Sequence, residues 1–215
     1  MEFDMTHPAI TLSRTFGSGG TEVGFLVAQR LSWRFCDRRI LSQAAKALGV
    51  PPERLRCQEE RPCGFLEQVL NLTAFASPEV PYTPPLELPI YSKELFEAER
   101  SVMLRLLEQA PAVIVGRGGF FALKDRPATL HVRIQADAAY RARYLVEHGH
   151  AADLEAARQA VENSDRDRTA FTHEISGRDW WDPHNFHLVL DISQQGLEDC
   201  VDQIVAAAKL QLGHT

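Results

Sequence analysis

The chain has 215 residues, of which 45% are hydrophobic and 24% charged, a composition typical of one globular domain. A formal net charge of −6 argues against a broad nucleic-acid surface, and no apolar run approaches the ~20 residues of a membrane helix. Four cysteines without a C-x-x-C pair argue against a zinc site and fit reduced thiols. The N-terminal segment MEFDMTHPAI lacks an apolar signal segment, so we expect a cytoplasmic protein. From the net charge and the hydropathy we expect binding neither to nucleic acid nor to membranes.

Short apolar runs alternate with helical patterns along the chain. The run AITLS at 9–13 predicts a buried strand, and apolar residues at helical spacing from Val23 to Leu31 predict a helix after it. The further predicted elements are a strand at 35–36, a helix from Asp37 to about 48, two short helices in 51–75, a proline-rich loop at 77–89, a helix at 92–109, strands at 112–115 and 130–134, a helix from about 137, a long polar helix at 153–171, a strand at 188–192 and a C-terminal helix. This alternation predicts a parallel sheet covered by helices on both faces.

A glycine-rich loop, Gly17–Gly20, joins the first predicted strand to the first predicted helix. Its backbone N–H groups and the helix N-terminus would suit a phosphate, whereas the alternative is a tight turn without a ligand. Aligned with the pattern G-x-x-x-x-G-K-[ST], Arg14 replaces the first glycine and Gly20 replaces the lysine. The second glycine is Gly19, and Thr21 supplies the hydroxyl expected to bind Mg²⁺.

Arginines follow two later strands. Arg117 comes directly after the strand at 112–115, where a planar guanidinium suits a phosphate; the alternative is a surface arginine beside a turn. Arg141 and Arg143 begin the next helix, and SDRDR at 164–168 lies late in the long polar helix. In that segment Asp165 and Arg168 share a helix face, which also fits a solvated face with ion pairs.

Two adjacent tryptophans stand in GRDWWDP at residues 177–183. They are candidates for the wall of a base pocket, but core packing beside a turn is the more frequent role of such residues. The eight histidines show neither metal-ligand nor catalytic-triad spacing, so we assign them no role.

Seven blocks in order carry a resemblance to a known family: ITLSRTFGSGG, FCDRRI, VIVGRG, LHVRI with Tyr140-Arg141, DRDR, GRDWWDP and LVLDI. Through them the chain resembles, almost end to end, the cytidylate kinase-like family, a branch of the nucleoside-monophosphate kinases. The resemblance implies a single P-loop NTPase domain over residues 1–215, with a three-layer α/β/α fold around a central parallel sheet. It also implies a helical NMP-binding lobe at about 38–92 and a lid at about 137–180.

The resemblance further implies ATP and Mg²⁺ as cofactors and small nucleotides as partners, with a homodimer left open. The residues that it implies for ATP phosphates are Gly17, Ser18, Gly19, Gly20 and Thr21; those for the acceptor are Asp37, Arg117 and Asp167; those on the lid are Arg141 and Arg168.

The missing lysine leaves three functions open. The first is an ATP-dependent kinase of a nucleoside monophosphate, with CMP or dCMP as the first candidates. The second is a catalytically silent nucleotide-binding sensor, and the third is a kinase of a small non-nucleotide acceptor. For a kinase, our hypothesis is that Arg14 and the lid arginines replace the charge that Gly20 lacks, with Arg14, Arg117, Arg141 and Arg168 as the catalytic candidates.

Overall fold

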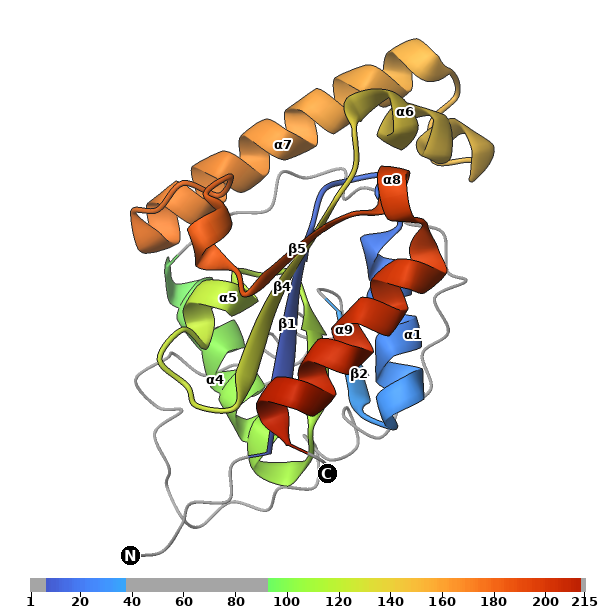
Figure 1. Cartoon of the computed structure of the whole chain (residues 1–215). Helices are drawn as coiled ribbons and strands as arrows, with labels where there is room; N and C mark the ends of the chain where they lie inside the picture. Colours follow the sequence, from blue (N-terminus) through green and yellow to red (C-terminus); the bar gives the residue numbers. More distant parts are fainter. Residues whose placement is uncertain (1–6, 38–92, 214–215) are drawn as a thin grey trace, which may run out of the picture.

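The computed structural model of the protein describes residues 7–37 and 93–213. Its centre is a sheet of five parallel strands in the order β2-β3-β1-β4-β5 (Figure 1). The strands are β1 (Ala9–Arg14), β2 (Arg34–Cys36), β3 (Ala112–Val115), β4 (Thr129–Gln135) and β5 (Leu188–Asp191). Helices cover both faces, so the predicted three-layer α/β/α fold with a central parallel sheet is confirmed.

Eight helices surround the sheet within the described residues: α1 (Gly20–Leu31), α4 (Lys93–Gln109), α5 (Gly119–Ala122), α6 (Ala138–Glu147), α7 (Leu154–Ser176), the 3₁₀ helix η2 (Pro183–Asn185), α8 (Ile192–Gln195) and α9 (Leu197–Leu212). Figure 1 shows α1 and α9 against one face of the sheet, α4 and α5 against the other, and α6 and α7 beyond the carboxyl ends of the strands.

The two faces of the sheet differ in chemistry. On one face Ile10, Leu12 and Val132 are fully or almost fully buried and pack with apolar residues of α1 and α9. On the other face the same strands carry buried polar side chains, and Thr11 Oγ1 is 2.7 Å from His131 Nδ1. A parallel strand alternates its side chains between faces, so this polar pairing stays beneath the helices without disturbing the apolar core.

The helices α6 and α7 form a pair with a small core of Ala142, Leu145, Ala157 and Val161. Each begins at an aspartate whose carboxylate accepts a backbone N–H, at 2.8 Å in both cases. The predicted end of α7 at residue 171 is wrong, because the helix continues to Ser176 and ends at Gly177, whose φ is +68°. A glycine in this left-handed conformation is the usual stop signal of a helix.

The predicted strand at 188–192 is one residue too long. Asp191 ends β5 and accepts the backbone N–H of Ser193 at 3.0 Å, so Ile192 begins α8 instead of continuing the strand. Apart from Asp37, the predicted elements at 37–48, 51–75 and 77–89, and the predicted NMP-binding lobe at 38–92, lie outside the described residues.

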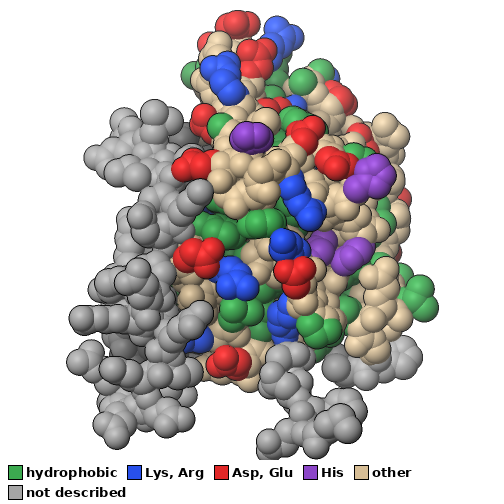
Figure 2. Space-filling model, turned by 90° about the vertical axis from the view of Figure 1, so that its left-hand side faces the viewer, with side chains coloured by type: hydrophobic (Ala, Val, Ile, Leu, Met, Phe, Trp, Pro, Cys, Tyr) green, Lys and Arg blue, Asp and Glu red, His purple; other side chains and the backbone are tan. Residues whose placement is uncertain are grey.

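The surface carries charges of both signs. On the face turned to the viewer in Figure 2, Lys and Arg side chains are interspersed with Asp and Glu, and neither sign forms a continuous area. Within residues 7–37 and 93–213, no helix combines the length and the hydropathy needed to cross a membrane.

Candidate active site

The glycine-rich loop lies where the strand order reverses. β1 is central, with β3 on one side and β4 on the other, and parallel sheets bind ligands beyond the carboxyl end of such a strand. The loop after β3 lies beside the one after β1, because Gly116 N–H donates to Leu12 O at 2.9 Å. The structure therefore brings together two segments that are a hundred residues apart in sequence.

The loop itself is tightly held. Gly17 and Gly19 have φ values of +77° and +74°, which favour glycine. Ser18 is fully buried, donates to Thr15 O at 2.8 Å and accepts the N–H of Gly20 at 3.3 Å. A Cβ on Gly17 would lie 2.7 Å from Arg141 O, so α6 rests directly on the loop. The first N–H groups of α1 open toward this turn and give it a partial positive charge.

Arg14 fills the place of a side chain at position 20. A Cβ added to Gly20 would lie 2.6 Å from Cβ and 3.2 Å from Cγ of Arg14, closer than real side chains allow. The side chain runs on toward the loop after β3, where a Cβ on Gly116 would overlap Nη1 and lie 3.2 Å from Cζ. On its way Nε donates to Thr21 Oγ1 at 3.4 Å. Both glycines are therefore required by the course of Arg14.

Arg117 lies at the carboxyl end of β3, as predicted, in a left-handed conformation with φ +54°. Its side chain is 4% exposed, and Nε donates to the buried carboxylate of Glu99 at 2.5 Å. Its Cζ also lies 5.5 Å from the ring centroid of Phe171 on α7. A strained non-glycine residue at a loop of this kind is typical of functional sites.

The lid arginines have different partners from those expected. Arg141 on α6 binds Asp165 on α7 through both terminal nitrogens, each at 2.9 Å. Arg168 donates to Ser164 and lies 5.9 Å from the ring centroid of Trp180. Asp165 and Arg168 lie three residues apart on α7, as expected for one helix face, but Asp165 forms its ion pair with Arg141 and thereby links the two helices.

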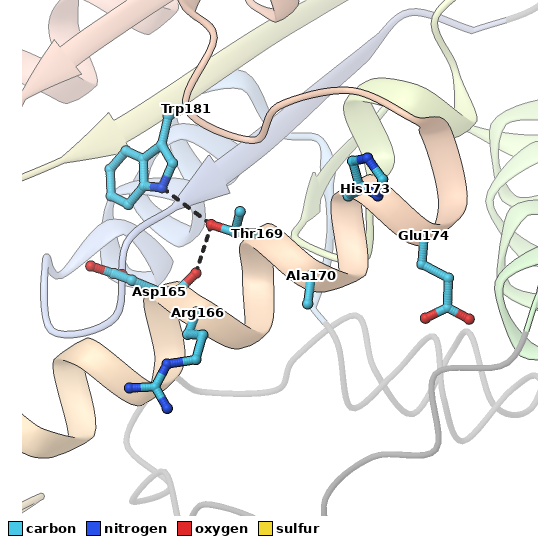
Figure 3. Close-up of a pocket in the computed structure, with 7 residues that line it drawn as sticks. All are labelled: Asp165, Arg166, Thr169, Ala170, His173, Glu174 and Trp181. Carbon is cyan, nitrogen blue, oxygen red and sulfur yellow. Dashed lines mark hydrogen bonds between the residues drawn. The ribbon is translucent and has the colours of Figure 1, made fainter.

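A pocket of about 790 Å³ opens along α7 (Figure 3). This volume is in the range of small-molecule sites. It is lined by Asp165, Arg166, Thr169, Ala170, His173, Glu174 and Trp181. Asp165 both lines the pocket and binds Arg141, whose backbone rests on Gly17. The pocket is therefore separated from the glycine-rich loop by one ion pair.

Comparison with known families gives a match to the cytidylate kinase-like family over residues 9–194, which is most of the chain. The chain belongs to the cytidylate kinase-like family. Among solved structures, this cytidylate kinase-like protein is similar to an uncharacterized protein from Eubacterium ventriosum ATCC 27560, with 19% identity, a TM-score of 0.68, and coverage of 95% of this chain and 99% of that one.

Two further structures share the fold of the cytidylate kinase-like chain. A gluconokinase from Sinorhizobium meliloti 1021 has 14% identity, a TM-score of 0.51, and coverage of 96% of this chain and 94% of its own. TT1252 from Thermus thermophilus has 16% identity, a TM-score of 0.51, and coverage of 97% and 100%. No significant similarity to a curated protein was found. Family and fold together are those of phosphotransferases of the P-loop kinase type.

The two predicted acceptor aspartates of the cytidylate kinase-like chain lie apart. Asp37 is half-buried and directly follows β2, at the same carboxyl edge of the sheet as the glycine-rich loop. Asp167 is half-buried on α7 but does not line the pocket, whereas Asp165, two residues earlier, does. Asp167 therefore stays a prediction for the acceptor, and Asp165 is the aspartate of this motif that lines the pocket.

Two buried residues of the cytidylate kinase-like protein were missed by sequence reasoning. Arg133 on β4 is 1% exposed, and burial lowers the pKa of its guanidinium to about 10. His131 is 6% exposed, and burial, with a smaller contribution from His187, lowers its pKa to about 4. The available signal was the alternation in the strand LHVRI, where the polar residues His131 and Arg133 occupy every second position. This alternation places both of them on the face opposite Leu130 and Val132.

Proposed function

We propose that this protein is an ATP-dependent kinase that transfers the γ-phosphoryl group of ATP to a nucleoside monophosphate, with CMP or dCMP the first candidates. The main observation that supports this proposal is the path of the Arg14 side chain. It fills the space of a side chain at position 20 and reaches the loop after β3. A cation is thus retained at the glycine-rich loop although the lysine is missing. A positive charge kept at this loop is expected of a catalyst, whereas a turn that binds no ligand would not need it.

The energetics support this substitution. Phosphoryl transfer requires mainly positioning and positive charge around the moving group, and one arginine at such a site can contribute ~1,000- to 100,000-fold in rate. Loss of one preorganised donor costs about 100- to 1,000-fold. An arginine held between Gly20 and Gly116 is therefore sufficient in magnitude to offset the absent lysine.

The loop residues fit the nucleotide and its metal. Backbone N–H groups around Gly17–Gly20 and the N-terminus of α1 would bind ATP phosphates. Thr21 lies in the first turn of α1 with its hydroxyl beside Arg14 Nε, and a neutral hydroxyl completed by phosphate oxygens and water suits Mg²⁺. When bound, Mg²⁺ would neutralise the charge that develops between the phosphates.

The lid would contribute by changing partners. Both terminal nitrogens of Arg141 donate a hydrogen bond to Asp165, so ATP phosphates would have to compete with this carboxylate. A phosphate carries more charge and more acceptor oxygens than a carboxylate, which favours the exchange. Release of Asp165 would let α7 move relative to α6, and Arg168 on α7 would move with it. We expect this motion to close the site around the phosphates.

The acceptor would approach from the α7 side. Its phosphate oxygen attacks the γ-phosphorus while the bond to the β–γ bridging oxygen breaks and ADP leaves. Arg117 at the end of β3 would hold the acceptor phosphate, and Asp37 at the end of β2 lies on the same edge of the sheet. The pocket along α7 offers room for the remainder of the nucleotide.

The test is ADP formation from magnesium-ATP with a panel of nucleoside monophosphates, sugars and other small acceptors, together with thermal shifts of the same ligands. We expect ADP with one or more monophosphates, CMP or dCMP first. Thermal stabilisation by ATP without ADP from any acceptor would instead establish a nucleotide sensor. ADP formed only with a sugar or another small acceptor would establish a non-nucleotide kinase.

A further inference from the structure

The two tryptophans after α7 have separate roles in the structure. Trp180 is 3% exposed and packs in the interior with Phe120 and Phe186, whereas Trp181 is 42% exposed and lines the pocket. A large aromatic ring that is open to a pocket is a typical feature of binding sites.

The indole of Trp181 is fixed at its edge. Its Nε1–H donates to Thr169 Oγ1 at 3.2 Å, and Thr169 Oγ1 donates in turn to Asp165 O at 2.9 Å. The backbone N–H of Trp181 donates to Asp179 Oδ1 at 2.9 Å. Figure 3 shows the ring above α7, with its six-membered part seen nearly face-on from the side of the pocket. The ring is therefore held in one orientation before any ligand arrives.

A buried arginine lies behind the ring. Arg133 Cζ is 4.5 Å from the ring centroid of Trp181 and 4.6 Å from that of Trp180, and Nη1 donates to Trp180 O at 2.7 Å. Its Nε and Nη2 are buried and have no hydrogen-bond partner in the part of the chain that the structure describes. The contacts with the two indoles are thus the main interactions of this guanidinium, and they tie the tryptophan loop to the central sheet.

The cation behind the ring selects what can stack in front of it. The face of an aromatic ring attracts positive charge, and Arg133 already draws on this attraction from one side. The open face of Trp181 is consequently a weaker partner for the positively polarised C–H groups of a sugar. It is a better partner for the π-electrons of a heteroaromatic base.

From this arrangement we infer that Trp181 is the stacking platform for the base of the acceptor nucleotide, with Arg133 as the positioning residue behind it. The inference rests on the proposed kinase function and adds the residues that bind the planar heteroaromatic base of the acceptor. Polar side chains of Arg166, His173 and Glu174 also line the pocket along α7 and are available to the base and its sugar (Figure 3). The acceptor phosphate would then extend toward Arg117 at the end of β3, whose guanidinium lies over the Phe171 ring of α7.

The test compares ligands that differ only by the base. Calorimetry measures the affinity of the four ribonucleoside monophosphates and of ribose 5-phosphate for the wild type, Trp181→Phe and Trp181→Leu. Stacking on an aromatic side chain contributes about 5- to 150-fold in affinity per base. We expect Trp181→Leu to lose about that factor for the preferred monophosphate but not for ribose 5-phosphate, and Trp181→Phe to retain most of the preference.

Tryptophan emission gives a second readout that does not depend on turnover. The preferred monophosphate should quench the wild type and Trp33→Phe, because Trp33 precedes β2 at the opposite end of the sheet. It should fail to quench Trp181→Phe. Arg133→Met should weaken the binding of the monophosphate but not that of ribose 5-phosphate. This difference would distinguish a role of Arg133 in positioning the Trp181 ring from a general loss of structure.

The outcomes distinguish the proposed base-stacking role of Trp181 from the proposed kinase activity. Equal affinity of the wild type for every monophosphate and for ribose 5-phosphate would overturn the platform, as would an unchanged preference in Trp181→Leu. If ADP still forms with a monophosphate in that case, the kinase proposal stands alone. If instead Trp181→Leu loses the preference but the wild type forms no ADP, the platform stands and the kinase proposal fails.

Discussion

The side chain of Arg14 and a side chain at Gly20 exclude each other, because a Cβ on Gly20 would lie 2.6 Å from Cβ of Arg14. The usual P-loop pattern has glycine at the first of these positions and lysine at the second. This chain has the reverse arrangement, with the large cation at position 14 and the glycine at position 20. The two departures from the pattern are therefore one coupled change and not two separate losses.

Removal of the Arg14 side chain should abolish most turnover. We expect Arg14→Ala to lower kcat by about 100- to 1,000-fold, the usual effect of losing one preorganised donor at a transition state. The control is Arg143→Ala, since Arg143 is exposed on α6, and its kcat should stay within about twofold of the wild type. Steady-state kinetics with magnesium-ATP and the preferred acceptor measure both. An Arg14→Ala enzyme as fast as the wild type would rule out the compensating role.

The coupling predicts that two harmful substitutions rescue each other. Gly20→Lys alone should destabilise the fold by about 1–3 kcal/mol, because its Cβ overlaps that of Arg14. Arg14→Gly alone should lose the cation. The double variant Arg14→Gly/Gly20→Lys restores the usual pattern, so we expect kcat at least about tenfold above either single variant and a recovered melting temperature. Strictly additive effects in this double-mutant cycle would contradict a shared space.

Gly116 is the second glycine that the course of Arg14 requires. Gly116→Ala should lower kcat by about 10- to 100-fold, because the added Cβ displaces the Arg14 guanidinium. Gly149→Ala is the matched control: Gly149 also has a positive φ, of +67°, but its Cβ would meet nothing within 4 Å. Both variants should lose about 1 kcal/mol of stability from the backbone conformation, and only Gly116→Ala should lose activity. Equal activities in the two variants would show that the position of Arg14 does not matter.

His131 should make the fold sensitive to mild acid. Burial first, and His187 second, lower its pKa from 6.5 to about 4 in the folded state. Above pH 6.5 the ring is neutral in both states, so its contribution to stability is complete. As the pH falls from 6.5 toward 4 only the unfolded chain takes up the proton, and the fold should lose up to about 3 kcal/mol.

Urea unfolding between pH 7 and pH 4 measures this loss. We expect His131→Gln to reduce the slope of the unfolding free energy against pH in that window by about one proton. His184→Gln is the comparison variant, because the His184 side chain is 91% exposed and its removal leaves no cavity in the core. An identical slope in wild type and His131→Gln would mean that folding does not lower the pKa of His131.

Much of the fold follows from local pattern. Short apolar runs located β1, β3 and β4 because buried parallel strands read as short continuous apolar segments. Helix caps such as Asp137 and the glycine-rich loop were visible because they depend on residues adjacent in sequence. The end of α7 was not predicted, because its stop signal, Gly177, is also the first residue of the segment GRDWWDP, which contains the two tryptophans.

The amino-acid order by itself determined that a glycine-rich turn follows the first strand and that arginines follow the later ones. Only the tertiary structure decided which groups meet: Arg14 with Gly20 and Gly116, and Arg141 with Asp165. It also decided that Trp180 is buried and Trp181 open, which no pattern in WW distinguishes. The reason is physical, because strand and cap signals act between neighbours in the chain. Steric exclusion, ion pairing and burial act between residues that only the packed sheet and helices bring within a few ångströms.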